Sequence, residues 1–146
     1  MNIVCNILNI KIEYKNEILY LLSLNKYNIG MKTEIVVFEH IESDVVYYIG
    51  TNAKDNHNVV DKGTPDDLWF HIANFPSCHV VVNLPDNFDK NVLRSIIKKG
   101  SMLCKQNTKR VANLDNVEIM YAPIKNITKT HVAGEVLVSK YKSIFV

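Results

Sequence analysis

One amphipathic helix constrains the fold of this chain more than any other part of the sequence. Over residues 89–107, apolar side chains recur at helical spacing and form a single face, made by Val92, Leu93, Ile96, Ile97, Leu103 and Cys104. Asp86 or Asp89 can supply the N-cap. The opposite face carries cations that project together into water, namely Lys90, Arg94, Lys98 and Lys105. The sequence therefore predicts one long helix that is apolar on one side and basic on the other.

Most of the remaining chain has the composition of β-strands. Residues 34–41 and 45–49 are rich in β-branched and aromatic residues, and the turn-like segment Glu42-Ser43-Asp44 between them predicts a β-hairpin. Further strands are expected at residues 68–72, 80–82, 117–121, 135–138 and 141–146. A brief helix is expected within residues 52–62, ended by Gly63 and Pro65. The predicted fold class is α+β, with a mostly antiparallel or mixed sheet and one long basic helix.

Chain length and apolar content predict a single domain. The 146 residues, 47% of them hydrophobic, are enough to bury a core without disulfide bonds. Residues 1–30 are expected to be an N-terminal extension of uncertain structure: Ile10, Ile12 and Tyr14 alternate as in a strand, while residues 17–28 fit a helix or a strand equally. Residues 31–146 are expected to form the domain.

Three absent patterns predict the cellular location of the chain. No apolar run approaches the roughly 18 residues that a membrane helix requires, and the N-terminus lacks the pattern of a secretory signal. The three cysteines, Cys5, Cys78 and Cys104, are widely spaced and odd in number, which is not the pattern of a disulfide framework. We expect a reducing, cytoplasmic setting with no membrane association.

Charge is distributed unevenly along the chain. Residues 34–67 contain eight acidic residues and two lysines, a net charge of −6. Residues 90–129 contain nine basic and two acidic residues, a net charge of +7. The molecule is therefore expected to be electrically two-sided, although its overall net charge is only +2.

Signatures of catalysis are mostly missing, so we expect no enzyme and no cofactor. The chain has no glycine-rich phosphate loop, no Gly-x-Ser-x-Gly, no His-Glu-x-x-His and no Cys-x-x-Cys. His71, Cys78 and His79, with His57 upstream, could in principle bind zinc or form a nucleophile and its base. Adjacent residues of a strand point to opposite faces, however, so Cys78 and His79 are poorly placed to act together. No metal site is predicted.

Aromatic residues offer two readings. Phe70 and Ile72 face one side of their strand, and Trp69 and His71 face the other. Trp69 is either a core residue or a platform on which a nucleic-acid base stacks, and Tyr121 is a second candidate for stacking.

The motif Asp-Asp-Leu-Trp-Phe-His at residues 66–71, followed by Pro-Ser-Cys-His-Val at residues 76–80, resembles the signature of the NFACT RNA-binding domain. Its family-motif positions here are Asp67, Trp69, His71, Pro76 and His79. The resemblance extends to Gly-Thr-Asn-Ala at residues 50–53 and to the segment from residue 117 to Lys129, and covers residues 31–146.

This resemblance implies a non-enzymatic nucleic-acid-binding module, in the compact form of a short eukaryotic coiled-coil protein made mostly of this domain. The family includes tail-synthesis factors of ribosome quality control, whose other domains do not fit in this chain. The family's glycine and serine after the proline are Ser77 and Cys78 here, and a later glycine-rich element is reduced to residues 131–134. The turn geometry at those places is expected to differ.

The basic residues are expected to converge on one surface that binds phosphates. The candidate nucleic-acid-binding residues are Arg94, Lys98, Lys105, Lys109, Arg110, Lys125 and Lys129. Structured RNA, either tRNA or rRNA, is the expected partner, and DNA is a possible one. The alternative is a protein-interaction adaptor that docks a partner through the acidic half. The sequence leaves homo-oligomerisation open.

Overall fold

The computed structural model describes residues 30–38, 41 and 44–146. The predictions for residues 1–29, including the strand at residues 10–14 and the undecided segment 17–28, lie outside the described residues. The same holds for residues 42 and 43 of the predicted hairpin turn.

An antiparallel sheet of six strands organises the domain. Its spatial order is β1-β2-β4-β3-β5-β8, and every neighbouring pair is antiparallel. The strands are β1 (Lys32–Val37), β2 (Asp44–Ile49), β3 (Leu68–Ile72), β4 (Val80–Val82), β5 (Glu118–Pro123) and β8 (Lys142–Phe145). The predicted α+β class and the hairpin formed by β1 and β2 are confirmed.

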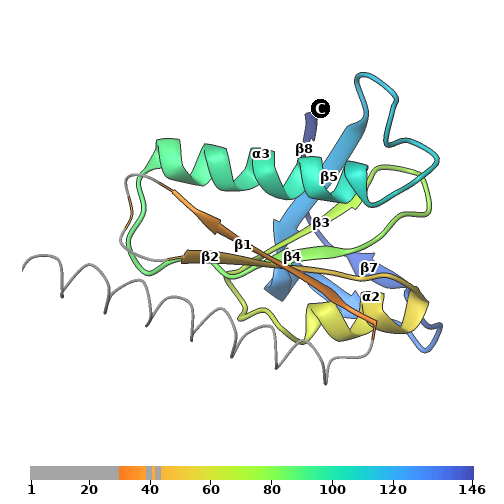
Figure 1. The fold of residues 1–146 in the computed structure, drawn as a ribbon. Coiled ribbons are helices and arrows are strands. Elements are labelled where there is room, and N and C mark those ends of the chain that lie inside the picture. The colour runs from red at the N-terminus through yellow and green to blue at the C-terminus, as the bar shows by residue number, and fades with distance from the viewer. Residues whose placement is uncertain (1–29, 39–40, 42–43) are drawn as a thin grey trace, which may run out of the picture.

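The long amphipathic helix, α3 (Lys90–Gln106), covers one face of this sheet (Figure 1). Asp89 is its N-cap, because the Asp89 carboxylate accepts hydrogen bonds from the main-chain N–H groups of Asn91 and Val92. Ile96 is fully buried among the side chains of Phe70 and its neighbours. Gly100 permits α3 to approach the sheet closely, since a Cβ at this position would lie 2.5 Å from the ring of Phe70.

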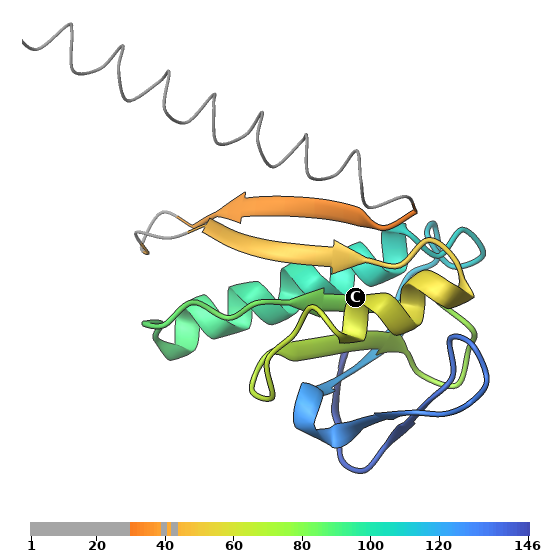
Figure 2. The ribbon, with the colours of Figure 1, turned by 90° about the horizontal axis from the view of Figure 1, so that it is seen from below.

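The opposite face of the sheet is also covered. There α2 (Ala53–Val60) and a separate two-stranded sheet, β6 (Ile127–Lys129) and β7 (Val136–Val138), pack around Trp69 and Val81 (Figures 1 and 2). A short 3-10 helix, η1 (Ile124–Asn126), connects β5 to β6. Sequence analysis predicted β7 but did not predict β6. Among the described residues, no helix has the length and apolar character needed to cross a membrane.

Candidate nucleic-acid interface

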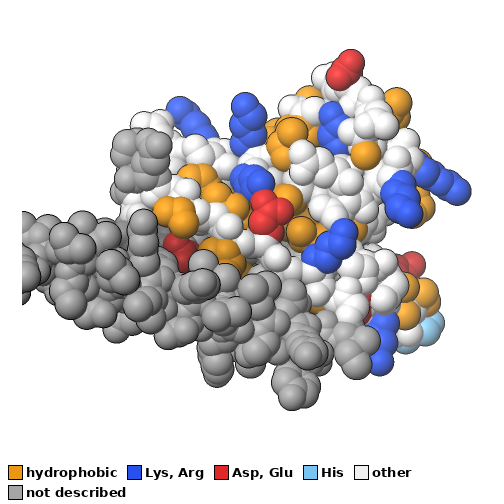
Figure 3. All heavy atoms as spheres, viewed as in Figure 1, with side chains coloured by type: hydrophobic (Ala, Val, Ile, Leu, Met, Phe, Trp, Pro, Cys, Tyr) orange, Lys and Arg blue, Asp and Glu red, His pale blue; other side chains and the backbone are white. Residues whose placement is uncertain are grey.

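The exposed side of α3 presents cations to solvent. Arg94 and Lys98 are exposed, and no carboxylate within the described ranges pairs with either of them. Lys and Arg side chains stand along α3 and around its C-terminal end (Figure 3). Lys105 is half-buried instead, and its Nζ donates to the main-chain oxygen of Val146 at 3.3 Å. Lys90 is likewise exposed without a carboxylate partner among the described residues, so the free positive charge on α3 belongs to Lys90, Arg94 and Lys98.

The predicted convergence of Lys125 and Lys129 with these helix residues is wrong. Lys125 lies in η1 and Lys129 in β6, and the apolar residues beside them, Ile124 and Ile127, pack around Trp69. That packing places both lysines on the side of the sheet opposite α3. Period-two alternation does not tell which face a later segment will cover, because such contacts are not local in sequence. The sequence-based prediction that either lysine binds nucleic acid is not tested by these contacts.

Lys125 and Lys129 are also neutralised by the acidic half of the chain. Lys125 Nζ lies 2.7 Å from Asp66 Oδ1, and Lys129 Nζ lies 2.5 Å from Asp61 Oδ1. Five of the six described carboxylates between residues 34 and 67 have an internal partner: Glu34, Asp55, Asp61, Asp66 and Asp67. Most of the described acidic side chains in this half of the chain are thus paired within the molecule.

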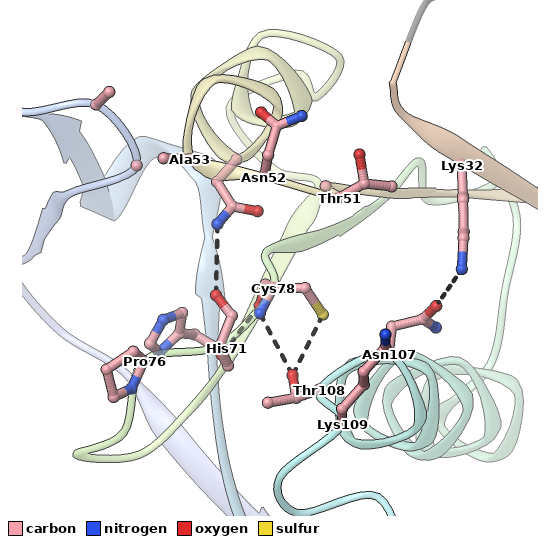
Figure 4. Close-up of a pocket in the computed structure, with 15 residues that line it drawn as sticks. Lys32, Thr51, Asn52, Ala53, His71, Pro76, Cys78, Asn107, Thr108 and Lys109 are labelled. Atoms are coloured by element: carbon pink, nitrogen blue, oxygen red, sulfur yellow. Dashed lines mark hydrogen bonds between the residues drawn. The ribbon is translucent and has the colours of Figure 1, made fainter.

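A cavity of about 590 Å³ opens at the end of the sheet where α3 terminates (Figure 4). Four connections meet there: the β2–α2 loop, the β3–β4 loop, the segment after α3 and the β6–β7 loop. Among the side chains that line it are those of Lys32, Thr51, His71, Pro76, Asn107 and Lys109. Three of these positions, His71, Pro76 and Lys109, were predicted as motif or nucleic-acid-binding residues.

Sequence analysis missed Lys32 and Asn107 as candidate site residues. The Nζ of Lys32 at the start of β1 donates to Asn107 Oδ1 at 3.1 Å, which joins the first strand to the end of α3. The two residues are separated by 75 positions. The available signal was indirect: the Gly-Thr-Asn-Ala segment of the family resemblance also lines this cavity.

Asp67 organises the turn before β3. Its carboxylate is buried and accepts hydrogen bonds from the main-chain N–H groups of Thr64 and Leu84, each at 2.7 Å, and from Asn83 Nδ2 at 2.8 Å. Charge-assisted bonds of this kind are stronger than bonds between neutral groups. The first motif residue therefore fixes the backbone at one end of β3.

Trp69, His71 and His79 form one packed aromatic group. Trp69 Nε1 donates to His79 Nδ1 at 3.1 Å, and the Trp69 ring stacks on His71 with centroids 5.5 Å apart. Burial first, and then the neighbouring His71 and His57, lower the pKa of His79 to about 3. Trp69 is only 1% exposed, so its predicted alternative role as a stacking platform is wrong. It is a core residue with a satisfied indole N–H.

Tyr121 remains a candidate for stacking. Its ring is half-buried on the α3 side of the sheet, with its centroid 6.1 Å from that of Phe70. It lines a separate pocket of about 390 Å³ with Leu93 and Ile97, away from the cavity at the end of α3. A role for Tyr121 in binding a base stays a prediction.

Cys78 and His79 point to opposite faces, as the alternation predicted. Cys78 belongs to the core beneath α3, where its Sγ donates to the carbonyl oxygen of Cys104 and accepts from Thr108 Oγ1. His79 lies with Trp69 on the other face. Within the described part of the chain, no cluster of three or more His, Cys, Asp or Glu side chains is arranged to hold a metal ion.

Replacing Asp67 by asparagine is expected to lower the free energy of unfolding by about 1.5–3 kcal/mol. Asparagine has one acceptor oxygen and turns an NH₂ group toward at least one of the three donors that the carboxylate serves. Urea unfolding followed by circular dichroism measures the change. Asp66→Asn is the matched control, because Asp66 is exposed and its one ion-pair partner among the described residues is exposed Lys125, a contact worth about 1 kcal/mol at most. Equal losses in the two variants would contradict this role of Asp67.

The fold and the site define a small α+β domain with a basic helical surface and a cavity at one end of its sheet. The chain belongs to the family of the NFACT protein RNA binding domain, whose sequence profile matches residues 34–139. The resemblance drawn from the motif is thereby confirmed, and the family is one of RNA-binding domains.

Among individual proteins, the chain is 30% identical over 106 residues to a coiled-coil domain-containing protein 25 homolog from Dictyostelium discoideum, covering 70% of this chain and 52% of that protein. It is 31% identical over 88 residues to coiled-coil domain-containing protein 25 from Danio rerio, covering 57% of this chain and 41% of that protein. The chain thus spans about half the length of these relatives.

A solved structure shares the fold. The C-terminal part of the fibronectin/fibrinogen-binding protein from Streptococcus suis superposes with a TM-score of 0.64 at 22% sequence identity, covering 79% of this chain and 45% of that chain. This similarity concerns the arrangement of helices and strands.

Proposed function

We propose that this protein is a non-enzymatic module that binds structured RNA through its phosphates, using the α3 surface that carries Arg94 and Lys98 and continues to Lys109 and Arg110. The observation that carries the proposal is that these four cations are exposed and have no carboxylate partner within the described residues. Cations that are free in the unbound protein can neutralise phosphates and release counterions without first breaking an ion pair. Membership of an RNA-binding family supports RNA as the ligand.

The RNA is proposed to be tRNA or rRNA, in a cytoplasmic role connected with translation or ribosome quality control. The family resemblance supports that context. A protein surface that binds phosphates in this way also attracts duplex DNA, since contacts with the nucleic-acid backbone carry little sequence information. The adaptor alternative has less support, because most described carboxylates of the acidic half are engaged within the molecule.

The double variant Arg94→Gln/Lys98→Gln is expected to bind tRNA at least tenfold more weakly than the native chain. Each lost phosphate contact also lowers the slope of log K against log salt by about one, so the slope should fall by about two. Fluorescence anisotropy with labelled tRNA at several salt concentrations measures both quantities.

Lys125→Gln/Lys129→Gln is the matched control. It removes the same net charge from the opposite side of the sheet, where both lysines are already paired with Asp66 and Asp61. We expect its affinity and salt slope to stay close to native. If the two double variants lose affinity equally, overall charge and not the α3 surface governs binding, and the proposal fails. Parallel titrations with duplex RNA and duplex DNA establish the preferred nucleic acid.

A further inference from the structure

Two ammonium groups from distant parts of the chain line the cavity at the end of α3. Lys32 begins β1, and Lys109 follows α3. Lys32 Nζ has one partner, Asn107 Oδ1, and Lys109 has none among the described residues. No acidic side chain of the described residues lines this cavity. The nearby carboxylate of Asp55 is buried, and it accepts from Thr51 and Asn52. The side of the cavity formed by Lys32 and Lys109 is therefore suited to an anionic group.

His71 supplies a hydrogen-bond acceptor on the other side of the cavity, next to Pro76 (Figure 4). His71 Nδ1 lies 2.7 Å from the carbonyl oxygen of Ile72, and a carbonyl only accepts, so Nδ1 carries the ring proton. Burial lowers the pKa of His71, which keeps the ring neutral near pH 7. Nε2 therefore presents a lone pair, and no donor in the described ranges meets it. A hydroxyl or amine of a ligand can fill that place.

The cavity has the dimensions of a site for a small organic group. Its volume of about 590 Å³ lies within the roughly 300–1,000 Å³ typical of small-ligand sites. A nucleic-acid duplex is too wide to enter such a space, whereas one nucleotide, with an anion at one end and hydroxyl and amine donors at the other, matches both sides of it.

We propose that this cavity binds one unpaired nucleotide of the RNA, with its phosphate at Lys32 and Lys109 and its ribose or base against His71 and Pro76. The inference rests on the proposed function: the α3 surface supplies general affinity for phosphates, and the cavity selects RNA that presents a nucleotide outside a helix. Structured RNAs expose such nucleotides in loops, bulges and ends.

Ala133→Tyr tests the proposal by filling the cavity without changing charge. Ala133 is exposed in the β6–β7 loop and lines the cavity. The full-length variant is expected to bind a hairpin RNA with an unpaired loop about tenfold more weakly, the scale of one lost base contact. Its affinity for a fully paired RNA duplex should not change. Val132→Tyr is the control, because Val132 is 49% exposed beside Ala133 and does not line the cavity.

A second measurement uses small probes on the native chain. In ¹H–¹⁵N spectra, uridine 5′-monophosphate is expected to shift the backbone amide signals of residues 50–53, 77, 78 and 107–109. Uridine and inorganic phosphate should bind more weakly, because each fills only one side of the cavity. Lys32→Gln should reduce the shifts caused by the monophosphate. Melting temperatures of all variants establish that they are folded.

The outcomes separate this inference from the proposed function. If Ala133→Tyr binds hairpin RNA and uridine 5′-monophosphate as the native chain does, the cavity proposal is overturned, while loss of binding in Arg94→Gln/Lys98→Gln still supports the α3 surface. If the monophosphate binds in the cavity but neither hairpin nor duplex RNA binds the native chain at low salt, the proposed function fails instead.

Discussion

Replacing Trp69 by alanine is expected to lower the free energy of unfolding by about 3–5 kcal/mol, a large fraction of the stability of a domain of this size. The indole is 1% exposed and packs with Val59, Val60 and Val81, so it joins α2 and the small β6–β7 sheet to the main sheet. Truncation leaves a cavity and also leaves His79 Nδ1 without its donor. Urea unfolding followed by circular dichroism measures the loss.

Trp69→Phe separates the contribution of apolar packing from that of the hydrogen bond to His79. Phenylalanine keeps most of the apolar ring but cannot donate to His79, so we expect a loss of about 1–3 kcal/mol. A loss below 1 kcal/mol in Trp69→Ala would mean that this face of the sheet is not a packed core. Below their melting temperatures, both variants should keep the native affinity of the α3 surface for RNA, because that surface lies across the sheet.

Acidification is expected to destabilise the protein through His79. Its pKa is about 3 in the folded chain, where burial excludes the charged form, and close to 6.5 once the chain unfolds. Between these values the unfolded chain takes up a proton that the folded chain does not, so the free energy of unfolding falls as the pH falls. The part of the unfolding free energy that depends on a neutral His79 is fully present above about pH 6.5. Below that pH it decreases by up to about 1.4 kcal/mol per pH unit, and the total loss is roughly 4–5 kcal/mol. The lowered pKa of His71 acts in the same direction.

His79→Gln isolates this effect. Glutamine retains an acceptor for the indole of Trp69 but does not titrate, so the difference in unfolding free energy between the native chain and the variant should shrink as the pH falls from about 7 to about 4.5. Urea unfolding at several pH values within that interval gives the difference. A difference that stays constant over the interval would contradict a neutral, buried imidazole.

The sequence located most elements of the fold because their signals are local. Apolar spacing identified α3 to within a residue at each end, and β-branched runs identified the strands of the main sheet. Among the strands that the structure describes, only β6 was missed. Its three residues, Ile-Thr-Lys, are too few to show a periodicity, and they lack the purely aliphatic composition that marked the equally short β4 and β7. The family motif was also readable, because its residues lie close together in the chain.

The roles of the motif residues required the tertiary structure. Asp67 and Trp69 look equally suited to a ligand or to a structural role when only their identities are known. Burial by α2 and β6–β7 assigns Trp69 to the core, and hydrogen bonds from Thr64, Asn83 and Leu84 assign buried Asp67 to the turn before β3. The cavity brings together residues as distant as Lys32 and Asn107, a pairing that no spacing in the sequence encodes.

By itself, the sequence determined the class of fold, the family and the basic face of α3, because each is written in residues that are neighbours along the chain. Only the tertiary structure decided which cations share a surface. Lys125 and Lys129 lie with Asp66 and Asp61 on the far side of the sheet because Ile124 and Ile127 bury themselves against Trp69. The burial of apolar side chains from distant segments determines on which face of the sheet a charged residue lies. The net charge of a sequence segment does not determine that face.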